Sequence, residues 1–350
     1  MMRRGGALGT DGVNIETRRA YIDFFVPGTD LQFRMGLQGL ALPAAVAGSP
    51  VMDDDVAAIV GSYSFNDMFS LSAFWARPYN INNGDTTNQN LKDEFDFTGL
   101  VLDINGDGFS ISPYGVYGLI GKDAGVSFNN VAVTGDDASA WWAGTAFELN
   151  MFDPIVFYAD AIYGAVGTDN DAAEASGWFL TGKLAYKLDM FTPTLTAWYG
   201  SGDDDDSTDG TERLPVISPA GFSPTSFGFD GGAGILRDRI LSRSGAGTWG
   251  VVLAAEDIKF FEDISHAVRV GYYEGTNDKD ADIYNTTNLN LSEKDSAWEI
   301  NVDTNYQIYE NLTAALQLGW IKLDLDDEVW GADDDTEDAW RCGVNLTYRF

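Results

Sequence analysis

The sequence predicts an all-β protein, a transmembrane antiparallel β-barrel of about 16 strands, of which 15 are visible in its 350 residues. Three observations predict this fold: apolar and polar residues alternate with a period of two, tight and long connections alternate along the chain, and Trp and Phe gather at opposite strand ends. Alternation gives each strand one apolar and one polar face. A bilayer outside and water inside require such a sheet.

Fifteen strands follow from the alternation. Most are ten to thirteen residues long, which is long for a soluble sheet but suits tilted strands that cross a bilayer. Their spans are 16–26, 31–40, 56–65, 68–77, 95–105, 108–120, 139–150, 154–165, 176–188, 192–201, 247–259, 264–274, 296–306, 311–323 and 339–350.

The connections predict a meander of hairpins with two different rims. Tight turns fall at Pro27–Asp30, Asn66–Asp67, Asn105–Gly108, Met151–Pro154, Asp189–Phe191, Phe260–Asp263 and Gln307–Asn311. Long loops fall between them at 41–55, 78–94, 121–138, 166–175, 202–246, 275–295 and 324–338. Short turns on one rim and long loops on the other are typical of outer-membrane barrels.

Aromatic residues separate the two rims in the same way. Nine of the ten Trp stand at strand ends beside long loops: 75, 141, 142, 178, 198, 249, 298, 320 and 340. Phe gathers near the tight turns instead, at 24, 25, 65, 69, 109, 152, 157, 191, 260 and 261. Two aromatic girdles indicate two membrane interfaces.

The final strand shows the pattern most clearly. Its apolar face carries Trp340, Cys342, Val344, Leu346, Tyr348 and Phe350, and its polar face carries Arg341, Gly343, Asn345, Thr347 and Arg349. Aromatics bracket the apolar face, as a lipid-facing strand requires. This ending, with its terminal Phe, resembles the C-terminal strand of Gram-negative outer-membrane barrel proteins, and we expect the chain to lie in that membrane.

Composition excludes some classes of partner. A net charge of −33, from 54 acids and 21 bases, argues against nucleic-acid binding, which needs clusters of Lys and Arg. The single cysteine, Cys342, allows no intramolecular disulfide. No run of about 18 apolar residues exists to form a membrane helix.

The strand count has the wrong parity for a closed barrel. Strand 16–26 would begin at the long-loop rim, whereas bacterial barrels normally have an even number of strands with both ends at the short-turn rim. Residues 1–15 show no alternation, and Met1–Arg4 lack the apolar core of a secretory signal. We therefore expect residues 1–350 to form one barrel domain that is incomplete at its N-terminus, with strand 16–26 unpaired or paired outside this sequence.

Several stretches resemble the homotrimeric outer-membrane porins of sulfate-reducing bacteria: Arg18–Pro27, Met35–Gln38, Ala73–Pro78 and the Tyr-Arg-Phe ending. The resemblance implies a water-filled homotrimeric channel for small hydrophilic solutes, with outer-membrane lipid and lipopolysaccharide as partners and further strands before Arg18. It also implies that a long loop folds inward as an eyelet. Loop 78–94, with Arg77 at its root, and loop 202–246 are the two candidates.

The polar strand face supplies the candidate pore-lining residues. They are Arg19, Asp23, Arg34, Arg77, Glu148, Asp160, Lys183, Lys187, Arg269, Glu299, Asp303 and Arg341. Two interpretations stay open: a solvated or self-paired wall, and a basic ladder that faces an acidic loop. Acids in the loops, such as Asp203–Asp206 and Asp333–Asp335, predict a mild cation preference that fades in high salt. Bases at the narrowest point, such as Arg34, Lys183 and Arg269, would override it.

Two other functions are weighed against a general diffusion channel. A substrate-specific outer-membrane channel would have the same fold. A barrel hydrolase would need a histidine near the long-loop rim, but the one histidine, His266, follows a tight turn and is predicted to face lipid. We predict no catalytic residue, metal site or cofactor; the acidic run Asp203–Asp206 could bind a divalent cation, but a solvated loop is the simpler interpretation.

Overall fold

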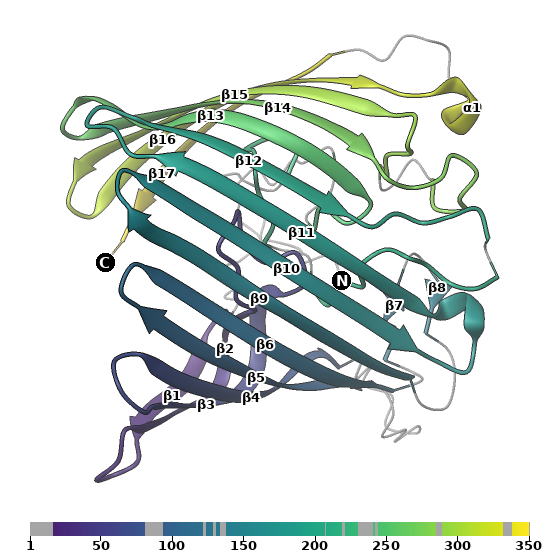
Figure 1. Ribbon diagram of the computed structural model, residues 1–350, viewed down its shortest axis with the longest axis horizontal. Helices are drawn as coiled ribbons and strands as arrows, with labels where there is room; N and C mark the ends of the chain where they lie inside the picture. Colours follow the sequence, from purple (N-terminus) through teal and green to yellow (C-terminus); the bar gives the residue numbers. More distant parts are fainter. Residues whose placement is uncertain are drawn as a thin grey trace, which may run out of the picture.

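The computed structural model contains one long antiparallel sheet. It describes residues 17–80, 94–121, 124–128, 131–133, 138–206, 208–218, 221–229, 241, 244–284, 289–331 and 338–349. Fifteen strands pair in chain order and curl around an interior (Figure 1). This confirms the predicted fold class and every predicted long strand. Position 16, loop residues 81–93 and Asp333–Asp335 lie outside the described residues.

The strands match the predicted spans closely. Their bounds are β1 Ala20–Phe25, β2 Leu31–Ala41, β3 Asp53–Ser64, β4 Phe69–Asn80, β5 Glu94–Gly106, β6 Phe109–Ile120, β9 Ala138–Phe152, β10 Ile155–Gly167, β11 Ala175–Tyr186, β12 Thr192–Gly200, β13 Thr248–Phe261, β14 Ile264–Gly275, β15 Ser296–Tyr309, β16 Leu312–Asp324 and β17 Ala339–Tyr348. Two further strands, β7 Ser127–Phe128 and β8 Val131–Ala132, form a small hairpin between β6 and β9 that the sequence pattern did not predict.

Side chains alternate between the two faces of the sheet. In β11, Trp178 and Leu180 are exposed, whereas Phe179 and Thr181 between them are buried. The exposed face is apolar along most strands, and the buried face is covered by loop segments inside the curve. An apolar outer face and a mixed inner face are what a barrel in lipid requires.

The outer face carries the predicted aromatic girdles. At the long-loop rim, Trp178 stacks on Tyr199 with 4.9 Å between ring centroids, and Tyr272 packs against Trp298 at the same distance. At the short-turn rim, Phe25, Phe65, Phe152, Phe260 and Phe261 are all exposed. Trp142 and Trp198 are exceptions to the girdle prediction: both are buried on the inner face, where their indole N–H groups donate to Pro215 O and Thr248 Oγ1.

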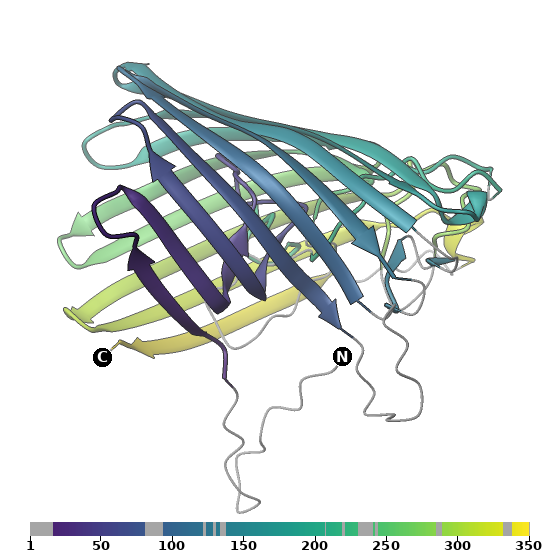
Figure 2. The same cartoon turned by 90° about the horizontal axis from the view of Figure 1, so that it is seen from below.

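The sheet has two edges among the described residues. β1 pairs with β2 and β17 pairs with β16, and no ladder joins β1 to β17. Figure 2 shows both edge strands, β1 in dark purple and β17 in yellow. The described helices are a 3₁₀ turn, Asp171–Ala173, and α1, Asp327–Trp330; neither is long and apolar enough to cross a membrane.

Candidate pore constriction

The connection between β2 and β3, residues 42–52, folds into the interior. Figures 1 and 2 show it as the purple segment inside the curve of the sheet. Val46, Val51 and Met52 are fully buried, although they belong to a connection. The carboxylate of Asp160 on β10 accepts hydrogen bonds from Ala45 N at 2.6 Å and Val46 N at 2.9 Å. A side chain of β10 thus holds the connection that leaves the sheet between β2 and β3.

A second inward segment, residues 221–229, belongs to the long connection between β12 and β13. Glu299 of β15, fully buried, accepts four hydrogen bonds that fix it: from Phe227 N, Gly228 N, Thr225 Oγ1 and Tyr273 Oη, at 2.7–3.0 Å. A carboxylate offers about four lone-pair sites, so Glu299 is fully used.

Ser226 is the second attachment point of this segment. Its amide donates to Asn301 Oδ1 at 3.0 Å, its hydroxyl to Asp303 Oδ1 at 3.1 Å, and its carbonyl accepts from Arg341 Nη1 at 2.8 Å. These partners come from β15 and β17. Polar side chains on two strands therefore hold one residue of the loop in place.

Aromatic packing fills the space behind segment 221–229. Phe222 and Phe229 of the loop pack on each other with 5.8 Å between ring centroids. Both rings lie 5.4 Å from Trp198 of the wall, and Phe229 lies 5.3 Å from Tyr273. Phe222, Phe229 and Tyr273 are fully buried. Each aromatic pair contributes about 0.5–1.5 kcal/mol beyond its burial. The β11–β15 side of the interior is accordingly a packed core.

The two inward segments also bind each other. Val51 O accepts from Ile217 N and Ser218 N, each at 3.0 Å, and Ala47 O accepts from Ser223 N at 2.7 Å. Gly48, at φ +91°, lies so close to Gly221 that a Cβ would be 2.1 Å from its carbonyl oxygen. The two connections form one unit across the lumen. Loop 202–246 is one of the two candidates for an inward loop that the sequence predicts, whereas segment 42–52 is not.

Most of the predicted pore-lining bases are ion-paired. Arg34 meets Asp23 at 2.6 Å, Arg19 meets Asp55 at 3.0 Å, and Arg77 meets Asp96 at 2.6 Å and also Glu94. Lys183 meets Glu256 at 2.7 Å, and Arg269 meets Asp303 at 2.5 Å. The geometry therefore favours the self-paired wall over the basic ladder.

The remaining candidate residues have different positions. Asp160, Glu299, Asp303 and Arg341 hold the inward segments, as described above. Lys187 follows the end of β11 and is exposed in the tight turn, so it lies outside the strand wall in which alternation placed it. Glu148, in contrast, lines a cavity.

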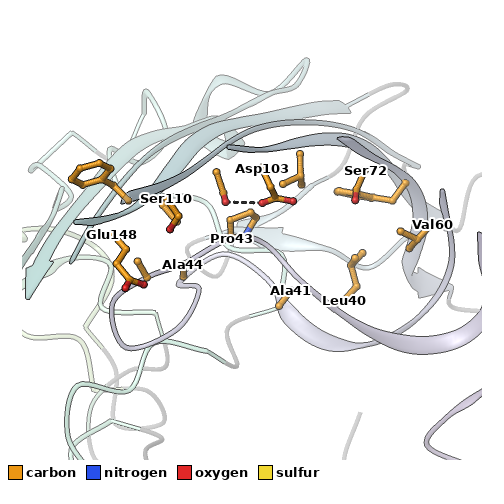
Figure 3. A pocket seen from close by; sticks show the side chains of 15 residues that line it. Leu40, Ala41, Pro43, Ala44, Val60, Ser72, Asp103, Ser110 and Glu148 are labelled. Atoms are coloured by element: carbon orange, nitrogen blue, oxygen red, sulfur yellow. Dashed lines mark hydrogen bonds between the residues drawn. The ribbon is translucent and has the colours of Figure 1, made fainter. Parts of the chain in front are cut away.

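This cavity, about 490 Å³, lies between segment 42–52 and the wall formed by β3–β6 and β9 (Figure 3). Asp103 of β5 and Glu148 of β9 both line it, and no Lys or Arg does among the residues that the structure describes. Asp103 accepts from Ser112 Oγ at 2.6 Å, and Glu148 accepts from Asn150 Nδ2 at 3.0 Å. Their partners are neutral, so the cavity carries two carboxylates without a compensating base.

A second cavity, about 290 Å³, adjoins the first. The two share Leu40, Ala41 and Val60, and the second adds a polar lining of Gln32, Arg34, Gln38 and Ser62. The second cavity lies along β2 and β3, and the first continues from it along the wall toward β9. We name the larger one the acidic chamber.

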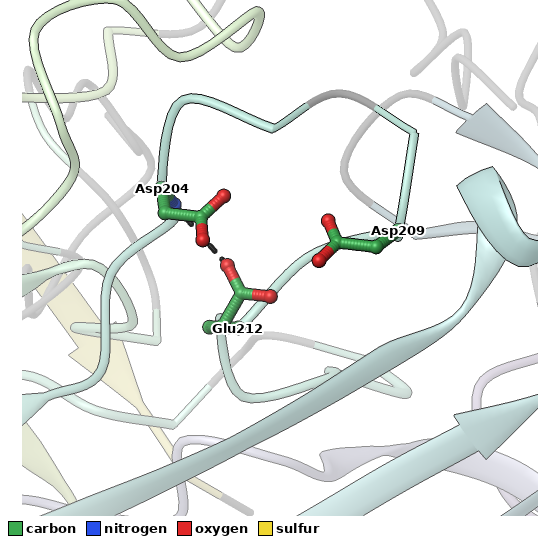
Figure 4. A group of neighbouring side chains, drawn as sticks. All are labelled: Asp204, Asp209 and Glu212. Carbon is green, nitrogen blue, oxygen red and sulfur yellow. Dashed lines mark hydrogen bonds between the residues drawn. The ribbon is translucent and has the colours of Figure 1, made fainter.

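Acids also gather at the long-loop rim. Asp204, Asp209 and Glu212 bring carboxylate oxygens within 4.8 Å of one another (Figure 4). Glu212 Oε2 accepts from the Asp204 amide at 3.1 Å. Partial burial, together with the nearby Asp204 and Asp203 charges, raises the pKa of Glu212. This cluster lies in loop 202–246, one of the acidic loops that the sequence predicted to attract cations.

His266 has the surroundings that the sequence predicted for it. Its ring nitrogen Nδ1 pairs with Thr304 Oγ1 at 2.8 Å, close to the short-turn rim, and Val268 and Val270 in phase with it are exposed. No carboxylate appears among the described partners of this imidazole. The arrangement gives no support to a hydrolase site at the long-loop rim.

Sequence reasoning missed segment 42–52 and Asp103. The composition of the segment could have revealed it: Leu42–Met52 contains Leu, two Val, three Ala and Met, which together are unusual in a solvated loop. Asp103 was obscured because Asp103–Gly108 looks like a turn signal. Only its pairing with Ser70 across β4 and β5 shows that it belongs to the inner wall.

Solved structures with the same architecture are Occ/Opd outer-membrane porins. Pseudomonas aeruginosa OccK11 (OpdR) matches with a TM-score of 0.51 and 14% identity, over 91% of this chain and 77% of that one. Acinetobacter baumannii OccAB3 matches with a TM-score of 0.54 and 13% identity, over 91% and 74%. Pseudomonas aeruginosa OpdK, crystallised with vanillate, matches with a TM-score of 0.53 and 11% identity, over 91% and 75%.

This chain has the fold of an outer-membrane porin barrel. The identities, 11–14%, establish the fold and nothing finer. No protein-family model matches the sequence, and no curated protein sequence does.

Proposed function

We propose that this protein is a diffusion channel of the Gram-negative outer membrane that selects among small hydrophilic solutes, rather than a wide general pore. The observation that carries the proposal is the pair of inward segments, 42–52 and 221–229, which dock on each other and on Asp160 and Glu299. About sixteen strands enclose an aqueous lumen, and inward loops narrow it. Structural similarity to Occ/Opd porins supports the proposal.

We further propose that the channel prefers cations, and that the preference arises at the acidic chamber. Asp103 and Glu148 lie inside the barrel, where low-dielectric walls screen charge less than bulk water does. The bases that could have opposed them are neutralised by Asp23, Asp96, Glu256 and Asp303. Rim acids such as Asp204 act over a longer, better-screened distance.

We also propose partners for the protein: membrane lipid, lipopolysaccharide and further copies of the same chain. Exposed apolar side chains along the outer face, such as Ile59, Leu100 and Leu253, support contact with membrane lipid, and the acidic long-loop rim would face lipopolysaccharide across bound cations. The resemblance to porins of sulfate-reducing bacteria supports a homotrimer. Cross-linking in detergent and in membranes tests that assembly.

Reversal potentials across a KCl gradient test the selectivity. We expect wild-type channels in a planar bilayer to prefer K⁺, and Asp103→Asn with Glu148→Gln to lower the permeability ratio at least threefold. Asp204→Asn at the rim is the matched control, since it removes one carboxylate without touching the chamber. Equal effects of the chamber and rim variants at 1 M salt would show that the chamber does not set selectivity.

A further inference from the structure

The acidic chamber presents its two carboxylates as separate points, not as a cluster. Glu148 pairs with Ser110 across β6 and β9, and Asp103 hydrogen-bonds Ser112, two residues further along β6. Asp103 and Glu148 are thus two strands apart, about 10 Å, and offset along the strands by about 7 Å. Their Cα atoms are then about 12 Å apart. Figure 3 shows both side chains on one wall, with Ser110 between them.

This spacing excludes one divalent metal ion shared by both acids. A calcium ion binds its oxygen ligands at about 2.3–2.6 Å, so two ligand oxygens lie within about 5 Å of each other. Two carboxylates on strands that are not neighbours do not meet that requirement. The pair instead offers two places for two positive charges on one molecule.

Apolar side chains and hydroxyl groups complete the lining of the acidic chamber. Segment 42–52 contributes Pro43 to the lining, and β2 contributes Leu40. The wall contributes Val60, Phe74 and Val101. Ser110 and Ser112 supply hydroxyl groups along the wall between the acids. Between the two acids, Pro43 and Ala44 lie opposite the hydroxyl groups of β6 (Figure 3), so this stretch of the chamber accepts a short apolar chain that carries a cation at each end.

We propose that the acidic chamber is a binding subsite for short aliphatic diamines on their way through the channel. Side chains on one face of a sheet stand roughly perpendicular to it, so the carboxylates keep about the 12 Å separation of their Cα atoms. A hydrogen bond of about 2.8 Å from each ammonium group then leaves roughly 6 Å between the two nitrogens. An extended chain advances about 1.2 Å per bond, so five bonds, a four-carbon diamine, span this distance. The inference rests on the proposed channel function and adds the class of solute.

Single-channel recording with butane-1,4-diamine and butylamine as probes tests the subsite. In a planar bilayer in 0.1 M KCl, we expect the diamine to interrupt the K⁺ current with a residence time at least tenfold longer than that of the monoamine. A length series should show the longest residence at four to five carbons. Asp103→Asn and Glu148→Gln should each bring the diamine-to-monoamine ratio close to one, whereas Asp204→Asn should leave it unchanged.

The outcomes separate the two proposals. A protein that conducts K⁺ but holds diamine and monoamine equally long has no such subsite, although it remains a channel. A longer residence of the diamine that survives both chamber variants also overturns the assignment, because another site then holds it. Failure of the wild-type protein to conduct at all overturns the channel function and the subsite together.

Discussion

At the scale of single residues, buried acids on the inner wall act as anchors for loops. Asp160 is 3% exposed and Glu299 is fully buried, and each accepts hydrogen bonds from loop backbone amides. A buried amide that loses its acceptor costs about 1–3 kcal/mol. These carboxylates therefore hold the inward segments, whereas Asp103 and Glu148, whose described partners are neutral side chains, line the chamber beside them.

Replacing Asp160 tests the anchoring role. Asp160→Ala leaves the amides of Ala45 and Val46 without an acceptor, so we expect segment 42–52 to loosen and the free energy of unfolding to fall by about 1–3 kcal/mol. Single-channel conductance should rise and become noisier. Asp67→Ala, in an exposed tight turn, is the control. Unchanged conductance in Asp160→Ala would show that segment 42–52 keeps its position without this anchor.

At the scale of elements, the constriction is made by two connections that pack as one unit. Segment 42–52 leaves the sheet between β2 and β3, and the connection between β12 and β13 supplies Ile217, Ser218 and segment 221–229. Backbone hydrogen bonds between the two connections, at Val51 and Ala47, join parts of the sheet that are eight strands apart. Such a cross-link narrows the lumen and braces the two walls against each other.

Gly48 provides a test of this docking. Gly48→Ala places a methyl group against Gly221 O and strains a left-handed backbone, at a cost of about 1–3 kcal/mol. We expect the two segments to separate, which should widen the channel and raise the permeation rate of larger solutes. Liposome swelling with sugars of increasing size measures this limit. Gly343→Ala, where a Cβ meets nothing within 4 Å, should leave the limit unchanged.

At the scale of the whole molecule, one sheet separates lipid from a largely filled interior. The outer face carries Ile59, Leu180, Leu195, Leu253 and many other exposed apolar side chains. The inner face combines ion pairs, loop anchors and an aromatic core. Both described cavities of the interior lie on the β2–β9 side, so a channel through this barrel would be off-centre.

Paired arginine substitutions on β3 test the assignment of the two faces. Ile59 is 42% exposed on the outer face, whereas Ser62 lines the second cavity on the inner face. We expect Ile59→Arg to lower the free energy of unfolding from lipid vesicles by about 2–4 kcal/mol, because arginine near the bilayer midplane is costly. Ser62→Arg should fold normally but reduce conductance. Urea titration in vesicles measures the first effect, and an equal loss in both variants would contradict the assignment.

The sequence alone determined the strands, their order and the two rims. Period-two alternation depends only on local geometry, since successive side chains of a strand point to opposite faces. Tight turns and girdle aromatics are likewise local signals. For this reason all fifteen long strands could be predicted to within a few residues.

Only the tertiary structure decided what the inward residues do. Asp160 meets Ala45 across 115 positions of sequence, and Ser226 meets Asp303 across 77. No local pattern distinguishes a carboxylate that faces water from one that caps a loop folded in from another strand. The same holds for the acidic chamber: Asp103 and Glu148 lie on one wall because β6 pairs with both β5 and β9, and the docked segment 42–52 closes the space opposite them.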